Sequence, residues 1–576
     1  MSDSGSNLNP SSSCVAIAAL GSVGRDSPAD VRQDTLNRER RALVTFRGWL
    51  ASRRTSNFIL SMATVAILVL SQSPHDLGFL ATVALVPWLI ALGRSGPLLA
   101  FVVSVVVGVA YAIVGANWLF AAFESQGAHG ISGTLSGLIA ALWGKGFLFG
   151  AIGLFVQRLC GRASAIRMIA PAILFGLAEL WISTSPWGLP LLLLGHSQHS
   201  IAGVAQLAVA VGVPGISMLL FAVNAAFASV FIDGRTGARA AISWAAIWLT
   251  IAIGGLPMAR ASERRVLEAR ASDAAFQSSS KTLLVIQPSI PLEQRWEAAY
   301  QQMILDQVAD ETSRAIGETG RMPHAILWPE NLLTFPVTQE NPIGRRLQDY
   351  VNDWGVPVVT GLVRAVDGDE PGRYRNSAVW WSPLVGQRDA IDKVRAIPLI
   401  ESGRGFWGRS ALARIVGEAA RGPRVEEARI ARPLRGEFTL SPVLCFEVLF
   451  PQIVVDRRDE RSVAIVNLAD DSWVAGEVVD AQLIAAASFR AIEQRLTLVR
   501  VSHGGLSVVI NRFGESIASL EPDTLGHLFV DVAAAPLPST FEKSSILCPL
   551  ILAGLVTWSL FPALCRRLDR TRRLIR

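Results

Sequence analysis

The segment Ser441-Pro442-Val443-Leu444-Cys445-Phe446-Glu447 carries a cysteine directly after an apolar run. Continuous apolar runs are typical of strands that are covered on both faces of a sheet. Cys445 is the one cysteine between residues 257 and 540. Two interpretations follow from this position. Cys445 is either a small apolar core residue, or a nucleophile held at the end of a buried strand.

Two further reactive residues lie at the C-terminal ends of other probable strands of the same region. Glu330 ends Ala325-Ile326-Leu327-Trp328-Pro329-Glu330, and Lys393 follows Ile391-Asp392. A thiol, a carboxylate and an amine are the groups that acyl transfer through a thioester requires. The alternative for Glu330 and Lys393 is an ion pair that only holds strands together. The cysteine in the same ordered set favours catalysis, because a structural ion pair does not require a thiol.

Apolar runs and helical patterns alternate through the region from 281 to 540. Helices are predicted at Trp296–Ile316 and Ala481–Gln494. Strands are predicted at Thr282–Gln287, Ala325–Trp328, Val356–Val363, Ser377–Trp381, Leu440–Leu444, Val463–Leu468 and Leu496–Val501. This alternation predicts a layered α/β domain.

The remainder of the chain has the composition of a membrane protein. The 576 residues are 51% hydrophobic and 17% charged, and the long uncharged runs lie within 58–256 and 544–564. Spans are predicted at about 58–73, 79–93, 98–120, 131–156, 168–184, 203–232, 238–256 and 544–564, the first two being short for a hydrocarbon core of ~30 Å. The expected domains are a basic tail (1–57), a seven-helix membrane domain (58–256), a linker (257–280), the α/β domain (281–540), an eighth span (544–564) and a basic tail (565–576).

The distribution of arginine predicts how these spans are oriented. Arginines occupy alternate connections, namely Arg94, then Arg158, Arg162 and Arg167, then Arg235 and Arg239. The other connections, 71–78, 121–130 and 185–200, contain neither Lys nor Arg. Because positive charge stays on the cytoplasmic side, both tails are expected in the cytoplasm and the α/β domain in the periplasm of a bacterium. The expected location is thus the bacterial inner membrane.

Two charged residues, Lys145 and Glu179, fall inside predicted spans. An isolated charge in the middle of a bilayer costs at least a few kcal/mol, so such residues usually pair or line a wet cavity. The alternative for Lys145 is a side chain that reaches toward the membrane interface. The segments Pro186–Pro190 and Gly195–Gln198 interrupt regular helix and predict a re-entrant segment that faces the α/β domain.

No pattern in the sequence calls for a metal or an organic cofactor. The seven histidines and five cysteines show neither His-x-x-x-His nor Cys-x-x-Cys spacing, and a glycine-rich phosphate loop is absent. The arginines cluster beside apolar segments, which indicates a membrane and not a nucleic acid. We therefore expect no metal, no cofactor and no nucleic-acid partner.

Several motifs occur in an order that resembles the carbon–nitrogen hydrolase (nitrilase) superfamily. They are Gln287-Pro288-Ser289-Ile290-Pro291 with Trp296, Trp328-Pro329-Glu330-Asn331, Asp392-Lys393, Cys445-Phe446-Glu447-Val448-Leu449-Phe450-Pro451, Asn467-Leu468-Ala469-Asp470-Asp471-Ser472-Trp473 and Arg490-Ala491-Ile492-Glu493. With seven spans before this domain and one after it, the chain resembles the apolipoprotein N-acyltransferase family from about residue 58 onward.

The resemblance implies a fold, a reaction and residue roles. The fold is an α-helical membrane bundle of about eight helices plus a nitrilase-like αββα sandwich. The reaction moves an acyl chain from a phospholipid to the N-terminal amine of an apolipoprotein. The implied roles are nucleophile for Cys445, general base for Glu330, oxyanion support for Lys393, a further acid for Glu401, and positions near the site for Glu447 and Trp296.

Two residues near the implied site each allow two interpretations. Glu447 follows the nucleophile closely and is either a group that orients Lys393 or a surface acid. His503 is more simply a structural group than a base, because a glutamate already fills that role.

The chain also departs from the family pattern. Pro-Phe-Gly-Glu is here Pro398-Leu399-Ile400-Glu401, Cys-Tyr-Glu is Cys445-Phe446-Glu447, Asn-Leu-Thr-Asn-Asp ends in Asp470-Asp471, and Asn-Thr-Gly is His503-Gly504-Gly505. Two alternatives to the acyltransferase therefore stay open. One is a conjugal-transfer-associated membrane protein of TraB type, an amidase or acyl-modifying enzyme with another acceptor. The other is a non-enzymatic assembly component.

Overall fold

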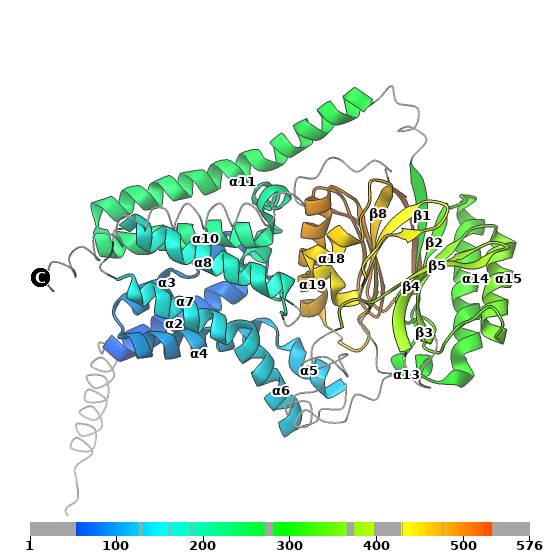
Figure 1. Ribbon diagram of the computed structural model, residues 1–576, viewed down its shortest axis with the longest axis horizontal. Coiled ribbons are helices and arrows are strands. Elements are labelled where there is room, and N and C mark those ends of the chain that lie inside the picture. The colour runs from blue at the N-terminus through cyan, green and yellow to red at the C-terminus, as the bar shows by residue number, and fades with distance from the viewer. Residues whose placement is uncertain are drawn as a thin grey trace, which may run out of the picture. The chain divides into compact units, whose positions relative to one another are not determined.

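The computed structural model in Figure 1 describes most of the chain from residue 53 onward. The described residues are 53–125, 130–160, 162, 164–185, 188–270, 280–365, 374–396, 428, 430–474 and 476–532. The predicted eighth span (544–564), the C-terminal tail (565–576) and most of the N-terminal tail (1–57) lie outside them, and so does Glu401.

In the first half of the described chain, all regular elements are helices. Its elements are α2 (Arg53–Ser71), η1 (Gly78–Thr82), α3 (Val86–Gly93), α4 (Pro97–Gly115), α5 (Trp118–Ser125), α6 (Ile131–Ala141), η2 (Leu142–Gly146), α7 (Phe147–Arg158), α8 (Ser164–Thr184), η3 (Leu194–Gln198), α9 (Ala202–Ala205), α10 (Ala208–Asp233) and α11 (Arg235–Arg270).

Among the described residues, five helical stretches are long and apolar enough to cross a membrane. These are Pro97–Gly115, Ile131–Arg158, Ala165–Thr184, Ala208–Asp233 and Arg235–Glu268. The apolar stretches Thr55–Ser71 and Gly78–Gly93 are shorter, as the short runs of the first two predicted spans suggested. The seven spans predicted within 58–256 thus coincide with seven apolar helical stretches, although only five have full length.

Helix α11 differs from the prediction at its C-terminal end. Residues 257–270, expected to begin a linker, continue the helix without a break. The physical reason lies in two ion pairs with the turn at 511–515. Arg260 lies 2.5 Å from Glu515, and Glu263 lies 3.1 Å from Arg512.

The two charged residues of the bundle form a buried pair. Lys145 lies in the π-helical turn η2, and its Nζ is 3.9 Å from Glu179 Oε1, with side chains only 4% and 0% exposed. Lys145 therefore does not reach toward an interface. Glu179 also accepts a hydrogen bond from the backbone N–H of Leu194 at 3.0 Å. That bond anchors η3, whose His196 ring lies 5.8 Å from Phe489 of the α/β domain, so the segment faces that domain as predicted.

Replacing only one partner of this pair is expected to destabilise the bundle. Lys145→Met leaves the Glu179 carboxylate buried without its cation, which typically costs about 3–5 kcal/mol. The double variant Lys145→Met/Glu179→Gln removes both charges and should recover most of the loss. Unfolding of the purified protein in detergent micelles measures both effects. A Lys145→Met protein as stable as the wild type would contradict this role for the pair.

The second half of the described chain is the predicted α/β domain. Its strands are β1 (Lys281–Gln287), β2 (Ala325–Leu327), β3 (Val358–Ala365), β4 (Tyr374–Ser382), β5 (Gly386–Asp392), β6 (Leu434–Arg435), β7 (Thr439–Leu444), β8 (Ser462–Asp470), β9 (Leu498–His503), β10 (Ser507–Ile510), β11 (Ser516–Leu520) and β12 (Gly526–Val532). Its helices are α13 (Leu292–Arg295), η4 (Ala298–Tyr300), α14 (Gln301–Thr319), α15 (Pro342–Trp354), η5 (Cys445–Leu449), α18 (Pro451–Asp456) and α19 (Glu477–Gln494).

The described strands form two six-stranded sheets that pack face to face. Their orders are β12-β1-β2-β3-β4-β5 and β11-β10-β9-β8-β7-β6. Strand β1 illustrates why the sheets pack in this way, because its side chains point alternately into two hydrophobic cores. Leu283 and Val285 pack between the sheets, whereas Leu284 and Ile286 pack against α14. Helices α14 and α15 cover the outer face of the first sheet, and α18 and α19 cover that of the second (Figure 1). The αββα sandwich is confirmed.

Candidate active site

The sheet topology brings the three predicted catalytic residues to corresponding strand ends. Strands β2 and β3 are parallel, and β5 runs in the same direction as β3 because each pairs antiparallel with β4. Glu330, which follows β2, and Lys393, which follows β5, therefore leave the first sheet at one edge. Cys445 follows β7, which is parallel to β8 in the second sheet.

Glu330 and Lys393 are in direct contact. Lys393 Nζ lies 3.3 Å from Glu330 Oε1, and the two side chains are 0% and 1% exposed. The Nδ2 group of Asn376, on β4, donates to the same Glu330 oxygen, and the Asn376 carbonyl accepts the backbone N–H of Lys393 at 2.7 Å. Asn376 thus fixes both residues. Strand β3 passes close to Glu330 at Gly361. A glycine is required there, because a Cβ atom would clash with Glu330 Cα at 2.5 Å.

Cys445 occupies a bend between β7 and η5. Its φ of 48° lies in the left-handed region, which costs a residue other than glycine roughly 1–2 kcal/mol. Non-glycine residues in this region persist where the surroundings hold them, and they cluster at functional sites. The thiol is buried and lies 3.9 Å from the Asp470 carbonyl oxygen, which accepts its hydrogen bond.

Glu447 connects the lysine segment to the cysteine segment. It is buried and forms an ion pair of 2.5 Å with Arg457, so it is not a surface acid. Its Oε1 accepts the backbone N–H groups of Val394 and Arg395 at 2.7 and 3.2 Å. Its Oε2 accepts the N–H of Leu444 at 2.8 Å. Glu447 therefore orients Lys393 through the backbone of the next two residues and ties that backbone to the residue before Cys445.

Trp296 lies at the end of α13 and is 39% exposed, so its ring faces solvent in part. Its neighbour Arg295 was not predicted, yet it contacts residues of the site directly. Arg295 is buried and donates to Asp470 at 2.8 and 3.0 Å and to the carbonyl of Asn331 at 3.4 Å. Arg295 thus links the residue after Glu330 to the residue whose carbonyl contacts the thiol.

The extra acid, Asp470, forms an ion pair with this arginine. Burial alone would raise the pKa of Asp470, but the positive charge and hydrogen bonds of Arg295 outweigh burial and lower it. Asp470 is therefore an ionised structural partner at neutral pH and not a second base.

His503 lies beside the same pair, in register with Asp470 on the neighbouring strand. Its burial, together with the charge of Arg295, holds its pKa well below 6.5. The imidazole is thus neutral, and neither ring nitrogen has a hydrogen-bond partner among the described residues.

An aromatic cluster borders Cys445. The ring of Phe446, which stands where the family has tyrosine, lies 5.8 Å from Trp118 and 5.9 Å from Trp473. Trp118 belongs to α5 of the helical bundle, and its Nε1 donates to Gln482 of α19 at 3.1 Å. The bundle therefore contributes a side chain that packs on the residue next to Cys445.

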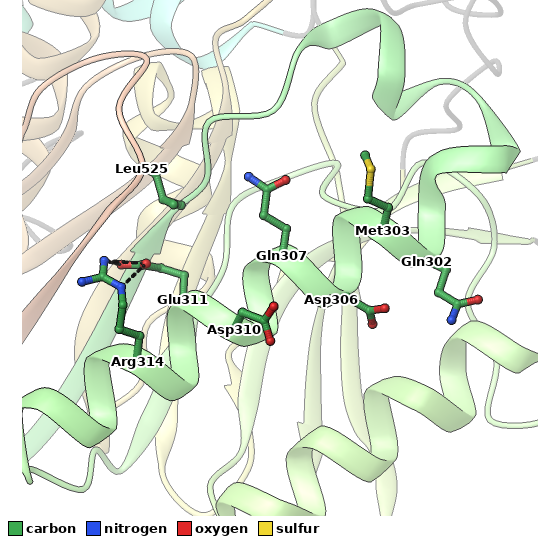
Figure 2. A pocket seen from close by; sticks show the side chains of 8 residues that line it. All are labelled: Gln302, Met303, Asp306, Gln307, Asp310, Glu311, Arg314 and Leu525. Carbon is green, nitrogen blue, oxygen red and sulfur yellow. Dashed lines mark hydrogen bonds and ion pairs between the residues drawn. The ribbon is translucent and has the colours of Figure 1, made fainter.

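A separate hollow of about 660 Å³ lies along α14 (Figure 2). It is lined by Gln302, Met303, Asp306, Gln307, Asp310, Glu311, Arg314 and Leu525. None of the predicted site residues lines it, and Glu311 is already paired with Arg314 and His527. We assign this hollow no part in the chemistry. Across the described part of the chain, no group of three or more His, Cys, Asp or Glu side chains is arranged to hold a metal ion.

Solved structures that match part of this chain include an amidase from Nesterenkonia sp. and Nit3 from Saccharomyces cerevisiae, described as a member of branch 10 of the nitrilase superfamily. The amidase is 19% identical, with a TM-score of 0.33, and the match covers 46% of this chain and 92% of the amidase. Nit3 is 13% identical, with a TM-score of 0.34, and the match covers 46% of this chain and 93% of Nit3.

Sequence comparisons extend over more of the chain. Residues 65–226 match the family model of the apolipoprotein N-acyltransferase N-terminal domain. The chain is 29% identical over 509 residues to the apolipoprotein N-acyltransferase of Brucella suis biovar 1 (strain 1330), covering 84% of this chain and 90% of that protein. It is 27% identical over 427 residues to the same-named protein of Bradyrhizobium diazoefficiens, covering 71% and 75%. On these matches, residues 65–226 are similar to the N-terminal domain of apolipoprotein N-acyltransferases, and most of the chain is similar to proteins of that name.

Proposed function

We propose that this protein is a membrane acyltransferase that moves a fatty acyl chain from a phospholipid to the N-terminal amine of an apolipoprotein. The observation that carries the proposal is the arrangement of Cys445, Glu330 and Lys393. The cysteine lies in a left-handed bend, the acid and the amine are 3.3 Å apart, and Glu447 ties their segments together.

The first half-reaction acylates Cys445. A free thiol has a pKa near ~8.5, so a base must remove its proton at neutral pH. Glu330 accepts that proton, and the sulfur attacks the ester carbonyl of the phospholipid. Lys393 stabilises the oxyanion of the tetrahedral intermediate. The ester C–O bond then breaks, the lysophospholipid oxygen takes the proton from Glu330, and the thioester remains.

The second half-reaction transfers the acyl chain. The α-amine of the apolipoprotein attacks the thioester carbonyl and gives a proton to Glu330. The C–S bond breaks, the amide forms, and the Cys445 sulfur regains its proton from Glu330. A lipid donor fits the position of the helical bundle, because Trp118 of that bundle packs on Phe446 beside the nucleophile.

A reconstituted assay tests the reaction. The purified protein in phospholipid nanodiscs, given a synthetic lipopeptide with a diacylglyceryl cysteine and a free α-amine, is expected to produce the N-acylated lipopeptide, detected by mass spectrometry. The Cys160→Ala variant, whose cysteine is exposed, should retain full activity. Free fatty acid without N-acylated product would indicate water as the acceptor, and unchanged lipid would indicate an assembly component without enzymatic activity.

We further infer that the α/β domain lies in the periplasm, with the bundle in the inner membrane. The alternation of arginines between successive spans supports this orientation. Alkaline phosphatase fused after Arg270, at the end of α11, is expected to be active. The same enzyme fused after Gly234, between α10 and α11, is expected to be inactive. The reverse pattern would overturn the orientation.

A further inference from the structure

A buried arginine lies two strands away from the nucleophile strand. Arg500 is on β9, and its side chain is fully buried. The strand register places Arg500 opposite Asn467 of β8, and Asn467 opposite Val443 of β7. The three residues therefore form one row across the second sheet, and this row ends two residues before Cys445.

The hydrogen bonds along this row leave Asn467 with one orientation. Arg500 Nη1 donates to Asn467 Oδ1, and a guanidinium can only donate. The Asn467 Nδ2 group must then face the other way, where it donates to the carbonyls of Val443 and Cys445, both at 3.1 Å. These carbonyls lie on the two sides of Leu444, where β7 ends and Cys445 turns left-handed.

We propose that Arg500 is a positioning residue for the nucleophile. It orients the Asn467 amide, which holds the backbone bend that presents the Cys445 thiol, and it supplies a buried positive charge on the second sheet. The inference rests on the proposed function and adds Arg500 and Asn467 to the residues that this function requires.

The charges around Arg500 support this role. Arg500 Nη2 donates to Asp471 Oδ2 at 2.5 Å, and Ser502 Oγ donates to the same oxygen at 2.6 Å. Burial alone would lower the pKa of Arg500, but the negative charges of Asp471, Asp480 and an ionised Cys445 outweigh burial and raise it. Attraction between two charges is mutual, so Arg500 also favours the thiolate.

Most of the other ionisable groups of the site are paired or neutral. Lys393 pairs with Glu330, Arg457 with Glu447, and Arg295 with Asp470, while the imidazole of His503 is neutral. Burial, reinforced by the charge of Asp471, raises the pKa of Asp480 to about 7. Substitution of Arg500 leaves these three ion pairs in place, but it also removes the partner of Asp471 and a charge that lowers the pKa of Asp480.

Two measurements test the proposal. The first is the pH dependence of Cys445 alkylation by iodoacetamide, in a Cys160→Ala background with other reactive cysteines followed by peptide mass spectrometry. Arg500→Met should move the alkylation midpoint upward by about one pH unit, because a nearby cation is lost. Arg500→Lys, which keeps the charge but not the planar fork, should stay near the wild-type midpoint.

The second measurement is the single-turnover rate of Cys445 acylation. Asn467→Leu and Arg500→Met should each slow acylation roughly 10- to 100-fold, and the double variant should be no slower, because both substitutions break one connection. Arg314→Met, on the outer helix α14, is the matched control and should acylate normally.

Two outcomes would overturn the proposal. In the first, the losses of acylation rate in the two single variants multiply in the double variant. In the second, Arg500→Met has the alkylation midpoint and the acylation rate of the wild type. If Arg500→Met does not fold, the alkylation midpoint of Arg500→Lys and the acylation rate of Asn467→Leu still test the proposal. If the wild type forms no acyl-enzyme, the proposed function fails, whereas the alkylation profile still tests Arg500.

Discussion

Purified protein reconstituted in phospholipid bilayers is expected to carry a fatty acyl group on Cys445 before any acceptor is added. The expectation follows from two half-reactions that use one nucleophile in turn, so the acylated enzyme accumulates when the second substrate is missing. Intact-protein mass spectrometry should detect an added mass equal to one acyl chain. Neutral hydroxylamine should remove it, because thioesters are cleaved under conditions that oxyesters largely resist.

The cysteines of the chain provide the controls. Cys445→Ala should abolish both the adduct and the transfer reaction, since no other group at the site is placed to form the thioester. Cys160→Ala, Cys548→Ala and Cys565→Ala should leave both intact. An adduct that survives in Cys445→Ala, or that resists hydroxylamine, would exclude the thioester mechanism.

Glu330 and Cys445 can be found in the sequence because each follows an apolar run, and Lys393 because it completes an ordered set with them. In a layered α/β fold, such runs are buried strands, and their C-terminal ends meet at common edges. The positions of Glu330 and Cys445 are therefore predictable without any knowledge of which strands pair. The prediction did not include β5, whose Gly-Gln-Arg-Asp-Ala sequence is half-exposed and lacks an apolar run, although Lys393 follows it.

The residues that hold this site were not predictable in the same way. Arg500 lies within Leu498-Val499-Arg500-Val501, where it is the single charged residue of an otherwise apolar strand segment. That it is buried depends on Asn467 and Asp471, which lie on and directly after another strand. Arg295 likewise contributes to the site only because the fold brings Asp470 into contact with it. A single sequence does not reveal such pairings, because they depend on strand register.

The departures from the family pattern look different once their contacts are known. Asp470 does not add a base, since Arg295 compensates its charge. Phe446 loses a hydroxyl but packs between Trp118 and Trp473, and Trp118 belongs to the helical bundle. The length of α11 was underestimated for a similar reason, because Glu515 and Arg512 of a distant turn stabilise its polar end.

Substitution of Glu330 or Lys393 is expected to stop acylation of Cys445 almost completely. Glu330→Gln keeps the shape of the side chain but cannot accept a proton, and losing a general base typically costs about 10²–10⁴ in rate. Lys393→Met keeps the length but removes the charge at the oxyanion, which typically costs about 10²–10³. Single-turnover acylation in nanodiscs measures both losses, and Glu318→Gln, on the exposed face of α14, serves as the control.

The pH profile distinguishes the two roles. Raising the pH toward ~8.5 ionises a free thiol without a base, so Glu330→Gln should recover part of its rate there. Lys393→Met should not recover, because its defect lies in the stabilisation of the oxyanion. Acylation of Glu330→Gln at the wild-type rate at neutral pH would show that another group removes the thiol proton.

The double variant Glu330→Gln/Lys393→Met separates catalysis from structure. Both charges of the buried 3.3 Å pair disappear together, so the variant leaves neither an uncompensated cation nor an uncompensated carboxylate. If the pair only held strands together, the double variant would regain stability and acylate Cys445. We expect it to regain stability, measured by thermal unfolding, and to remain inactive, because neither the base nor the oxyanion support has been replaced.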